Sequence, residues 1–350
     1  MSDERAPVRV LYTGGTIGCS GTPFTPMPGA QFQELCTSHG LGTDCAWEWT
    51  DTALDSAEVG PRDWAGLALR VLADDRPVVV LHGTDTMAWS AAALALLTTL
   101  LTPDGVPVAR RSAPVVFTGA QRPLFPSGAE RDPGSDGAAN LRAALVEATR
   151  PVPGVRIAFG GQIINGARAV KRSTLEDCAF SAPNGAGVLP PLPAATSEPL
   201  RDAVVALEPH MGARQVFPVP LMPGGGRQAA ESIALAMDAL GPRLGAVHLL
   251  GFGLGTVPGR EPLTPVLARA ADLDIIVALG TQVHKGPVEP AHYGAGAWTV
   301  PLGVLPAGDM TVPATQAKLH LTLALATIHG WKTDTSHNFM EQSIAGERSA

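Results

Sequence analysis

The chain has 350 residues, 45% of them hydrophobic, and a mean hydropathy of +0.14. This composition excludes a disordered chain, and the length predicts two domains with large cores. The formal net charge of -7 and the scattered placement of the 25 Lys and Arg residues argue against nucleic acid as a partner.

The cysteines and the first residues predict the compartment. Cys19, Cys36, Cys45 and Cys178 form no C-x-x-C pair and have no histidine at zinc spacing, so we expect a reduced, cytoplasmic protein. The N-terminus passes from charged residues into a strand without an apolar signal core, and the apolar run 91–101 is too short to span a bilayer. We therefore expect a soluble, unprocessed chain with no membrane partner.

In the first half of the chain, strands alternate with helices. Strand-like runs lie at 8–12, 77–82, 114–118 and 155–159. Apolar residues from Trp64 to Leu72 share one face of a predicted helix over 63–73, and a second helix follows a cap-like S135-DG-137. This alternation predicts α/β architecture with a larger N-terminal domain built on a parallel sheet of Rossmann or flavodoxin-like type.

A segment rich in Pro, Gly and Ala, 182–199, breaks both periodicities and is interpreted as a linker. The predicted domains are 1–190 and 216–350, with the linker at 191–215. In the smaller C-terminal α/β domain we expect strands at 216–221, 247–250 and 275–279, and helices around 232–240 and 265–272. Lys318 falls on a late helix predicted to be amphipathic, and the chain is expected to fray from about Glu341 to Ala350.

Three loops follow predicted strands: T13-GGT-16, H82-GTDT-86 and T118-GAQRP-123. In an open α/β sheet, ligands bind beyond the carboxyl ends of the strands, so these loops are expected to converge on one crevice. Their glycines would let backbone N–H groups approach a carboxylate or an oxyanion. For any one loop alone, an ordinary strand-to-helix turn with threonine as the N-cap is the better interpretation.

Motifs of other enzyme classes are missing. The sequence contains no G-x-G-x-x-G after the first strand, no G-x-x-x-x-G-K-[ST] and no G-x-S-x-G, and G251-FGLG-255 is interpreted as a turn. Histidines 82, 248, 284, 292 and 320 have no metal-ligand spacing and are expected to be hydrogen-bonded or surface residues. We expect neither a metal nor a cofactor.

A threonine hydroxyl needs a base within hydrogen-bond reach, and the base needs a group that orients it. A desolvated lysine beside a carboxylate can take these roles, as His and Asp do with serine elsewhere. Lys171, in G166-ARAVKRST-174, is better placed than Lys318 or Lys332, although an ordinary surface lysine is the alternative. Asp85 stands next to Thr84.

Six segments together resemble the bacterial type I, cytoplasmic L-asparaginase (asparaginase-glutaminase) family. They are TGGTIG, LHGTDTM, the TGAQRP loop, SDGAANL, GARAVK and G308-DMTVPATQAKLH-320. The resemblance runs from about Val10 to Glu347. It implies a homodimer or homotetramer that hydrolyses a small-molecule amide to a carboxylate and ammonia without metal or cofactor.

The resemblance also implies roles for single residues. Thr16 corresponds to the family's nucleophile and Thr84 to its second catalytic threonine. Asp85 would bind the substrate α-amino group and steady Lys171, and Ser56, in D55-SAEV-59, would hold the α-carboxylate; a polar turn is the alternative for Ser56. Further substrate contacts are implied at Gly15, Ala57, Gly83 and Ala120.

The sequence departs from the family pattern at two loops. In G21-TPFTPMPG-29, Phe24 replaces the family's loop tyrosine and supplies no hydroxyl. Ala57 replaces a polar side chain that grips the substrate, and a Pro/Gly-rich expansion at 125–134 is expected near the crevice. Three functions stay open: an asparaginase, a divergent amidase for a larger amide, and a non-catalytic amino-acid-binding homologue.

Overall fold

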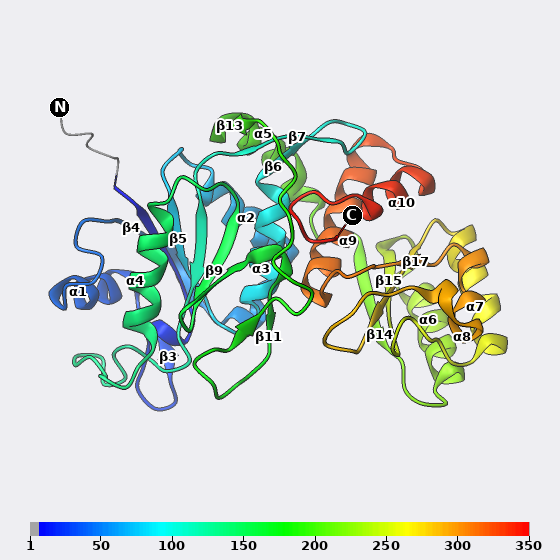
Figure 1. Ribbon diagram of the computed structural model, residues 1–350, viewed down its shortest axis with the longest axis horizontal. Helices are drawn as coiled ribbons and strands as arrows, with labels where there is room; N and C mark the ends of the chain where they lie inside the picture. Colours follow the sequence, from blue (N-terminus) through cyan, green and yellow to red (C-terminus); the bar gives the residue numbers. More distant parts are fainter. Residues whose placement is uncertain (1–6, 350) are drawn as a thin grey trace.

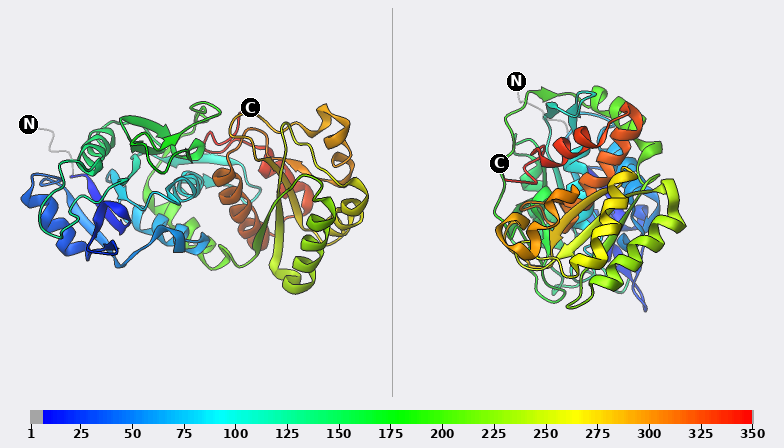
Figure 2. Two further views of the ribbon diagram at one scale, coloured as in Figure 1. Left: turned by 90° about the horizontal axis from the view of Figure 1, so that it is seen from below. Right: turned by 90° about the vertical axis from the view of Figure 1, so that its right-hand side faces the viewer.

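The computed structural model describes residues 7–349, which form a larger and a smaller lobe along the long axis of the molecule (Figures 1 and 2). The larger lobe contains a six-stranded sheet in the order β10-β9-β8-β5-β1-β4. Its strands are β1 (Arg9–Gly14), β4 (Ala46–Leu54), β5 (Val78–Leu81), β8 (Val115–Thr118), β9 (Val155–Phe159) and β10 (Gln162–Asn165). All neighbouring strands run parallel except β10, which pairs antiparallel with β9.

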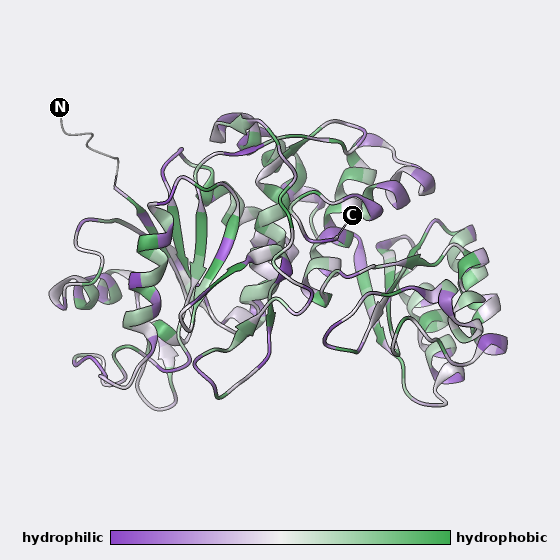
Figure 3. Cartoon of the chain, in the orientation of Figure 1, coloured by the Kyte–Doolittle hydropathy of each residue, from purple (hydrophilic) through white to green (hydrophobic). Residues whose placement is uncertain are grey.

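Helices cover both faces of this sheet. Alternate residues of the strands point to opposite faces, so Val10 packs with one set of helices and Leu11 with the other. In Figure 1, α1 (Gly29–Ser38) and α4 (Gly137–Ala148) lie to the left of the sheet, and α2 (Pro61–Val71) and α3 (Met87–Leu97) to its right. Because both faces are covered, the central strands are continuous apolar runs, which Figure 3 shows as green arrows.

The smaller lobe has a parallel sheet with the order β14-β15-β16-β17. Its elements are β14 (Gln215–Pro220), β15 (Leu244–Gly251), β16 (Ile276–Thr281), β17 (Leu305–Pro306), α6 (Gly226–Leu240), α7 (Arg260–Asp272) and α8 (Gly294–Ala297). The chain returns through α9 (Val312–His329) and α10 (Thr333–Glu341). A larger N-terminal lobe with a parallel sheet and a smaller α/β lobe confirm the predicted fold class.

The prediction of an amphipathic helix around Lys318 was wrong. Helix α9 packs against α3 of the larger lobe and against β14 and β15 of the smaller one. Contacts on both sides bury most of its residues, including Lys318, so the apolar residues are not confined to one stripe.

The predicted linker, 191–215, contains more regular structure than its composition indicated. Short strand β13 (Ala194–Ala195) and helix α5 (Ser197–Leu207) lie within it, and α5 packs against α2. Apolar residues of α5 recur at helical spacing beyond the last proline, which explains why a helix forms there.

The remaining short strands are β2 (Cys19–Ser20), β3 (Thr25–Pro26), β6 (Thr99–Leu101), β7 (Pro107–Arg111), β11 (Val170–Lys171) and β12 (Phe180–Ser181). The domain boundaries stay a prediction.

The expected fraying of the C-terminal residues was also wrong for 343–349, while Ala350 lies outside the described residues. Glu347 is fully buried and lies 2.7 Å from the Lys318 Nζ, which is fully buried as well. Arg110 donates to the Ile344 carbonyl at 2.7 Å. This C-terminal segment is therefore part of the core, because it carries the counter-charge of a buried lysine.

Arg168 joins the C-terminal segment to both lobes. Its guanidinium is 1% exposed and donates to Asp309 Oδ2 at 2.7 Å, to the Gly346 carbonyl at 2.6 Å and to Ser349 Oγ at 3.0 Å. Asp309 belongs to the smaller lobe, and Lys171 follows Arg168 by three residues.

Among residues 7–349, every helix is too short or too polar to cross a lipid bilayer. The expectation of an unprocessed N-terminus rests partly on residues 1–6, which lie outside the described part.

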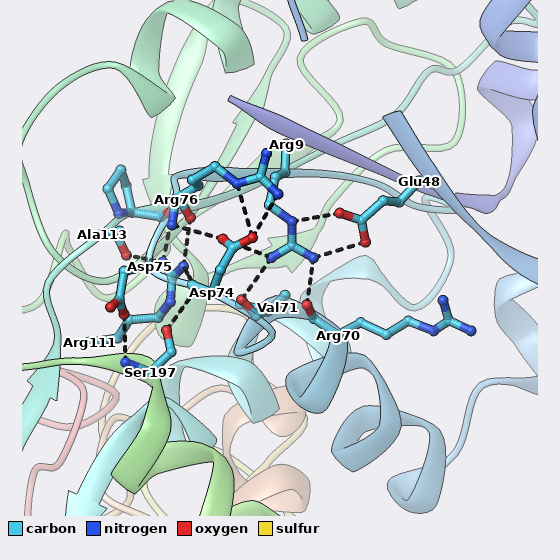
Figure 4. Close-up of polar contacts among 11 residues, drawn as sticks. Arg9, Glu48, Arg70, Val71, Asp74, Asp75, Arg76, Arg111, Ala113 and Ser197 are labelled. Carbon is cyan, nitrogen blue, oxygen red and sulfur yellow. Dashed lines mark hydrogen bonds and ion pairs between the residues drawn. The ribbon is translucent and has the colours of Figure 1, made fainter. Parts of the chain in front are cut away.

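A network of charged side chains closes the sheet at the amino ends of its strands (Figure 4). Arg9 is 1% exposed and binds both carboxylate oxygens of Glu48 at 2.7 and 2.9 Å. Arg111, equally buried, donates to the backbone carbonyls of Arg76 at 2.7 Å and Asp74 at 3.1 Å. The network ties β1 to β4, and β7 of the separate three-stranded sheet to the segment before β5, at the end of the large sheet away from the loops that follow its strands.

Candidate active site

Two glycines bring the first two predicted loops into contact beyond the carboxyl ends of β1 and β5. Gly15 has φ +81°, and a Cβ atom on it would lie 2.4 Å from Gly83 Cα. Only glycine permits this approach, because a side chain would clash and the backbone conformation is unfavourable for L-residues. Thr16 and Thr84, the residues that follow, are therefore held on adjacent loops.

Lys171 joins the second loop from the other side. The β11 strand carries its side chain to Thr84, with Nζ 2.9 Å from Thr84 Oγ1 and 2.7 Å from Asp85 Oδ1. The Lys171 side chain is 15% exposed and Thr84 is 5% exposed, whereas the Asp85 side chain is 70% exposed. A sheltered hydroxyl therefore has an amine within proton-transfer distance and a carboxylate that orients the amine, while that carboxylate also faces solvent.

A short turn after β4 places Ser56 beside the same loop. Ser56 begins a 3-10 turn over Ser56–Glu58, in which Asp55 accepts a hydrogen bond from the Ala57 N–H at 3.0 Å. Thr86 Oγ1 donates to the Ser56 carbonyl at 2.6 Å. The Ser56 side chain, 3% exposed, lies against Gly83, while Ala57 is exposed.

His82 stabilises the loop 82–86 through hydrogen bonds of both ring nitrogens. Its Nδ1 lies 2.8 Å from the Gly83 carbonyl and its Nε2 lies 3.0 Å from Ser90 Oγ, and burial lowers its pKa, so the ring is neutral. The expectation that this histidine is hydrogen-bonded is confirmed. His248, which is buried, and His320, which is half-buried, differ from His82 because each has one ring nitrogen without a hydrogen-bond partner among the described residues. Burial lowers the pKa of each to about 4, which keeps these rings uncharged.

The third loop is held by Asp136. Its carboxylate accepts hydrogen bonds from the Gln121 N–H at 2.9 Å, the Arg122 N–H at 3.1 Å and Asn140 Nδ2 at 3.0 Å. Ala120, fully buried, packs beside Gly137. The S135-DG-137 stretch had predicted a helix cap, but the Asp136 side chain makes no capping bond and binds the loop instead.

The hairpin after Thr16 carries Phe24. Strands β2 and β3 form this hairpin, and Phe24 at its tip is 58% exposed. Its neighbour is the expanded segment 125–134, since the Gly21 N–H donates to the Pro126 carbonyl at 3.0 Å. Tyr12, inside the sheet, donates its hydroxyl to the Met27 carbonyl at 3.0 Å and is buried, so that hydroxyl is already engaged.

The structure thus brings together most of the predicted residues. Thr84, Asp85 and Lys171 are joined by hydrogen bonds, and the loops of Ser56, Gly15 and Gly83 are in contact. Among the described residues, Thr16 makes no side-chain hydrogen bond to this group, and no cluster of His, Cys, Asp or Glu is arranged to hold a metal ion. The supporting residues Thr86, His82 and Asp136 were not predicted to have these roles, although they lie in H82-GTDT-86 and S135-DG-137.

Comparisons with known proteins agree with this arrangement. Residues 7–189 match the family model "Asparaginase, N-terminal", and residues 230–329 match "Glutaminase/Asparaginase C-terminal domain". The chain is 30% identical to L-asparaginase 1 of Escherichia coli K12 over 357 residues, which cover 98% of each chain.

Solved structures match over the whole chain. The thermostable L-asparaginase from Thermococcus kodakarensis has a TM-score of 0.75 at 27% identity, covering 99% of this chain and 100% of that one. L-asparaginase I from Vibrio cholerae has a TM-score of 0.74 at 26% identity with the same coverage. Together with the family models, these matches show that the chain belongs to the asparaginase family.

Proposed function

We propose that this protein is an amidohydrolase that converts L-asparagine to L-aspartate and ammonia through a threonine acyl-enzyme. The observation that carries the proposal is the Lys171 Nζ, 2.9 Å from Thr84 Oγ1 and 2.7 Å from Asp85 Oδ1. The named activity of the E. coli and T. kodakarensis relatives supports asparagine as the substrate.

Thr16 is the proposed nucleophile. It is only half-buried, whereas the Thr84 hydroxyl is sheltered and already bonded to Lys171. Thr16 Oγ1 attacks the amide carbon, and its proton passes through water to Thr84 and Lys171. The C–N bond then breaks, and the leaving nitrogen takes up a proton to depart as ammonia. Water hydrolyses the resulting ester, which releases the carboxylate and restores the threonine hydroxyl.

The remaining residues position the substrate. The exposed Asp85 carboxylate offers a counter-charge for an α-ammonium group, and Ser56 offers a hydroxyl for the α-carboxylate. Gly15, Ala57, Gly83 and Ala120 complete the proposed substrate site, the two glycines by leaving room for the ligand beside the backbone.

The test is ammonia release from L-asparagine, compared with L-glutamine and with N-substituted amides. We expect asparagine to have the highest kcat/KM. Absence of ammonia from every small amide would contradict the proposal and favour a non-catalytic amino-acid-binding protein.

A divergent amidase is the second candidate, and Phe24 favours it. Its exposed phenyl ring has no hydroxyl, whereas the family pattern has a tyrosine at this position of the loop. Ala57 in addition leaves space beside Ser56. Under this function, a larger or des-amino amide would be hydrolysed at least as well as asparagine.

We also propose a cytoplasmic homodimer or homotetramer with domains 1–190 and 216–350. Cys19, Cys36, Cys45 and Cys178 are all free thiols, which fits a reducing compartment. Light scattering coupled to size-exclusion chromatography measures the oligomeric state directly.

A further inference from the structure

A cavity lies next to the candidate active site and shares the loops of Ser56 and Gly83 with it. Its volume is about 320 Å³, and Thr13, Ser56, His82 and Gly83 form one wall. The catalytic candidates Thr16, Thr84, Asp85 and Lys171 do not line it. Ligand sites in proteins start at about this volume, so the cavity suits a molecule no larger than an amino acid.

Helix α2 forms the opposite wall, and Gly66 in the middle of it has no structural explanation within the chain. A Cβ atom added to Gly66 would meet nothing within 4 Å, so packing does not require a glycine. Glycine in a helix interior is destabilising compared with alanine. A side chain here would project into the cavity, and a glycine keeps that space open for a ligand.

Arg70 follows Gly66 by one helical turn and supplies a charge without an acidic partner. Long helical side chains lie over the turn that precedes them, which directs Arg70 toward Gly66. Arg70 forms no ion pair among the described residues, and its guanidinium donates one long hydrogen bond, of 3.4 Å, to the Trp49 carbonyl. Figure 4 shows its side chain extending away from the Arg9 network.

The other charged residues around the cavity already have polar partners. Arg62 pairs with Glu208 at 2.7 Å, and Asp63 accepts the Gly60 N–H at 2.8 Å. Arg70 is therefore the one cation of the lining that has no counter-charge. Val59 and Leu67 add an apolar surface beside it.

We infer that this cavity is a binding site for a small monocarboxylate with a short, mostly apolar tail. The carboxylate pairs with the Arg70 guanidinium in bidentate fashion, and the tail lies over Gly66 against Val59 and Leu67. Because Ser56 belongs to the shared wall, occupancy also changes the KM for the amide. That last consequence rests on the proposed function, whereas binding itself does not.

Binding is measured by calorimetry with sodium propionate, using sodium chloride at equal ionic strength as the blank. L-Alanine, which has the same three-carbon carboxylate plus an α-ammonium group, distinguishes a simple organic acid from an amino acid. We expect Arg70→Gln to weaken binding by about tenfold or more, since a charge-assisted hydrogen-bond pair is lost. The matched control is Arg201→Gln, which removes an exposed arginine of α5 and should keep wild-type binding.

Gly66→Leu tests the open space without relying on charge. The leucine fills the cavity and raises helix propensity, so binding should be lost while the thermal midpoint stays at or above that of the wild type. Gly66→Ala, which occupies less of the space, should weaken binding only in part. The inference would be overturned if neither carboxylate binds the wild type, or if Gly66→Leu and Arg70→Gln both bind as tightly as the wild type. Ammonia release by the wild type tests the proposed function separately.

Discussion

Lys171 reaches two oxygens of one loop, and each contact belongs to a different step of the proposed reaction. The bond to Thr84 lies on the path of the proton, and the bond to Asp85 fixes the direction of the amine. Substitutions of these three residues should therefore give different kinetic patterns.

Thr84→Val and Lys171→Met should each lower kcat by roughly 10³-fold or more, because either one breaks the proton path. Steady-state kinetics with asparagine measure this, and circular dichroism checks the fold. The double variant should be little worse than the worse single one, since the two residues act as a unit. Arg172→Met, which removes the neighbouring exposed cation, is the control and should keep near-normal turnover; near-normal turnover by Lys171→Met would reject Lys171 as the base.

Asp85→Asn should raise KM as well as lower kcat, because the substrate ammonium loses its counter-charge and Lys171 loses its orienting group. Comparing asparagine with its des-amino analogue separates the two effects. The analogue has no ammonium to lose, so its KM should change little in the variant. If the wild type hydrolyses the analogue as well as asparagine, Asp85 does not bind an amine and the divergent amidase is favoured.

Phe24→Tyr should raise kcat by roughly tenfold or more if Thr16 attacks, because the new hydroxyl at the hairpin tip supplies the missing proton acceptor. Phe24→Leu is the matched control and should stay at the wild-type rate. Trapping the acyl-enzyme with a slow substrate and mapping the modified peptide identifies the attacking residue. A label on Thr84, or no change in Phe24→Tyr, would reject Thr16 as the nucleophile.

At the scale of elements, the loop after β8 depends on one carboxylate, that of Asp136 just before α4. Asp136→Ala would leave the Gln121 and Arg122 N–H groups without their acceptor and should destabilise the protein by about 1–3 kcal/mol. Urea unfolding measures this change. Asp132→Ala removes a single hydrogen bond to Gly134 in the neighbouring loop and should cost clearly less. Equal losses for the two variants would show that Asp136 does not hold the loop.

The sequence predicted the central elements because their signals are local. The strands β5, β8 and β9 are apolar runs that end at glycine-containing loops, and the α2 stripe has regular helical spacing. Strand β4 was missed, since A46-WEWTD-51 mixes aromatic with acidic residues at the sheet edge, where Glu48 binds the distant Arg9.

Local sequence signals were also insufficient to predict the geometry of the candidate site. Short motifs identified Thr84, Asp85 and Lys171, but their distances depend on how β11 returns to the sheet. The role of Asp136 could not be predicted either, because its partners lie 14 and 15 residues earlier in a loop without periodicity.

For the whole molecule, the Arg168 and Asp309 contact makes stability depend on pH. Burial acts to raise the pKa of Asp309, but hydrogen bonds from Ser349 and Arg168 and the Arg168 charge outweigh it and hold the pKa below its ordinary value. Because the folded pKa is depressed, the stabilisation is fully present above the unfolded pKa of about 4 and is lost as pH falls through the folded value.

We therefore expect the urea concentration at the unfolding midpoint to decrease as the pH is lowered below about 4. Asp309→Asn should lower the free energy of unfolding at pH 7 and make it depend less on pH in the acid range. Asp104→Asn, at an exposed site, is the control and should follow the wild-type pH curve. An acid dependence of Asp309→Asn as steep as that of the wild type would show that other carboxylates dominate.

The buried pair of Lys318 and Glu347 has a consequence for synthesis on the ribosome. Domains fold as units while a chain is being made, and residues 343–349 are translated after every helix and strand they pack against. Until Glu347 leaves the exit tunnel, the Lys318 ammonium in α9 lacks its carboxylate, and α9 cannot settle between the two lobes without stranding a charge. The larger sheet can form earlier, but the junction between the lobes closes only after Glu347 has left the tunnel.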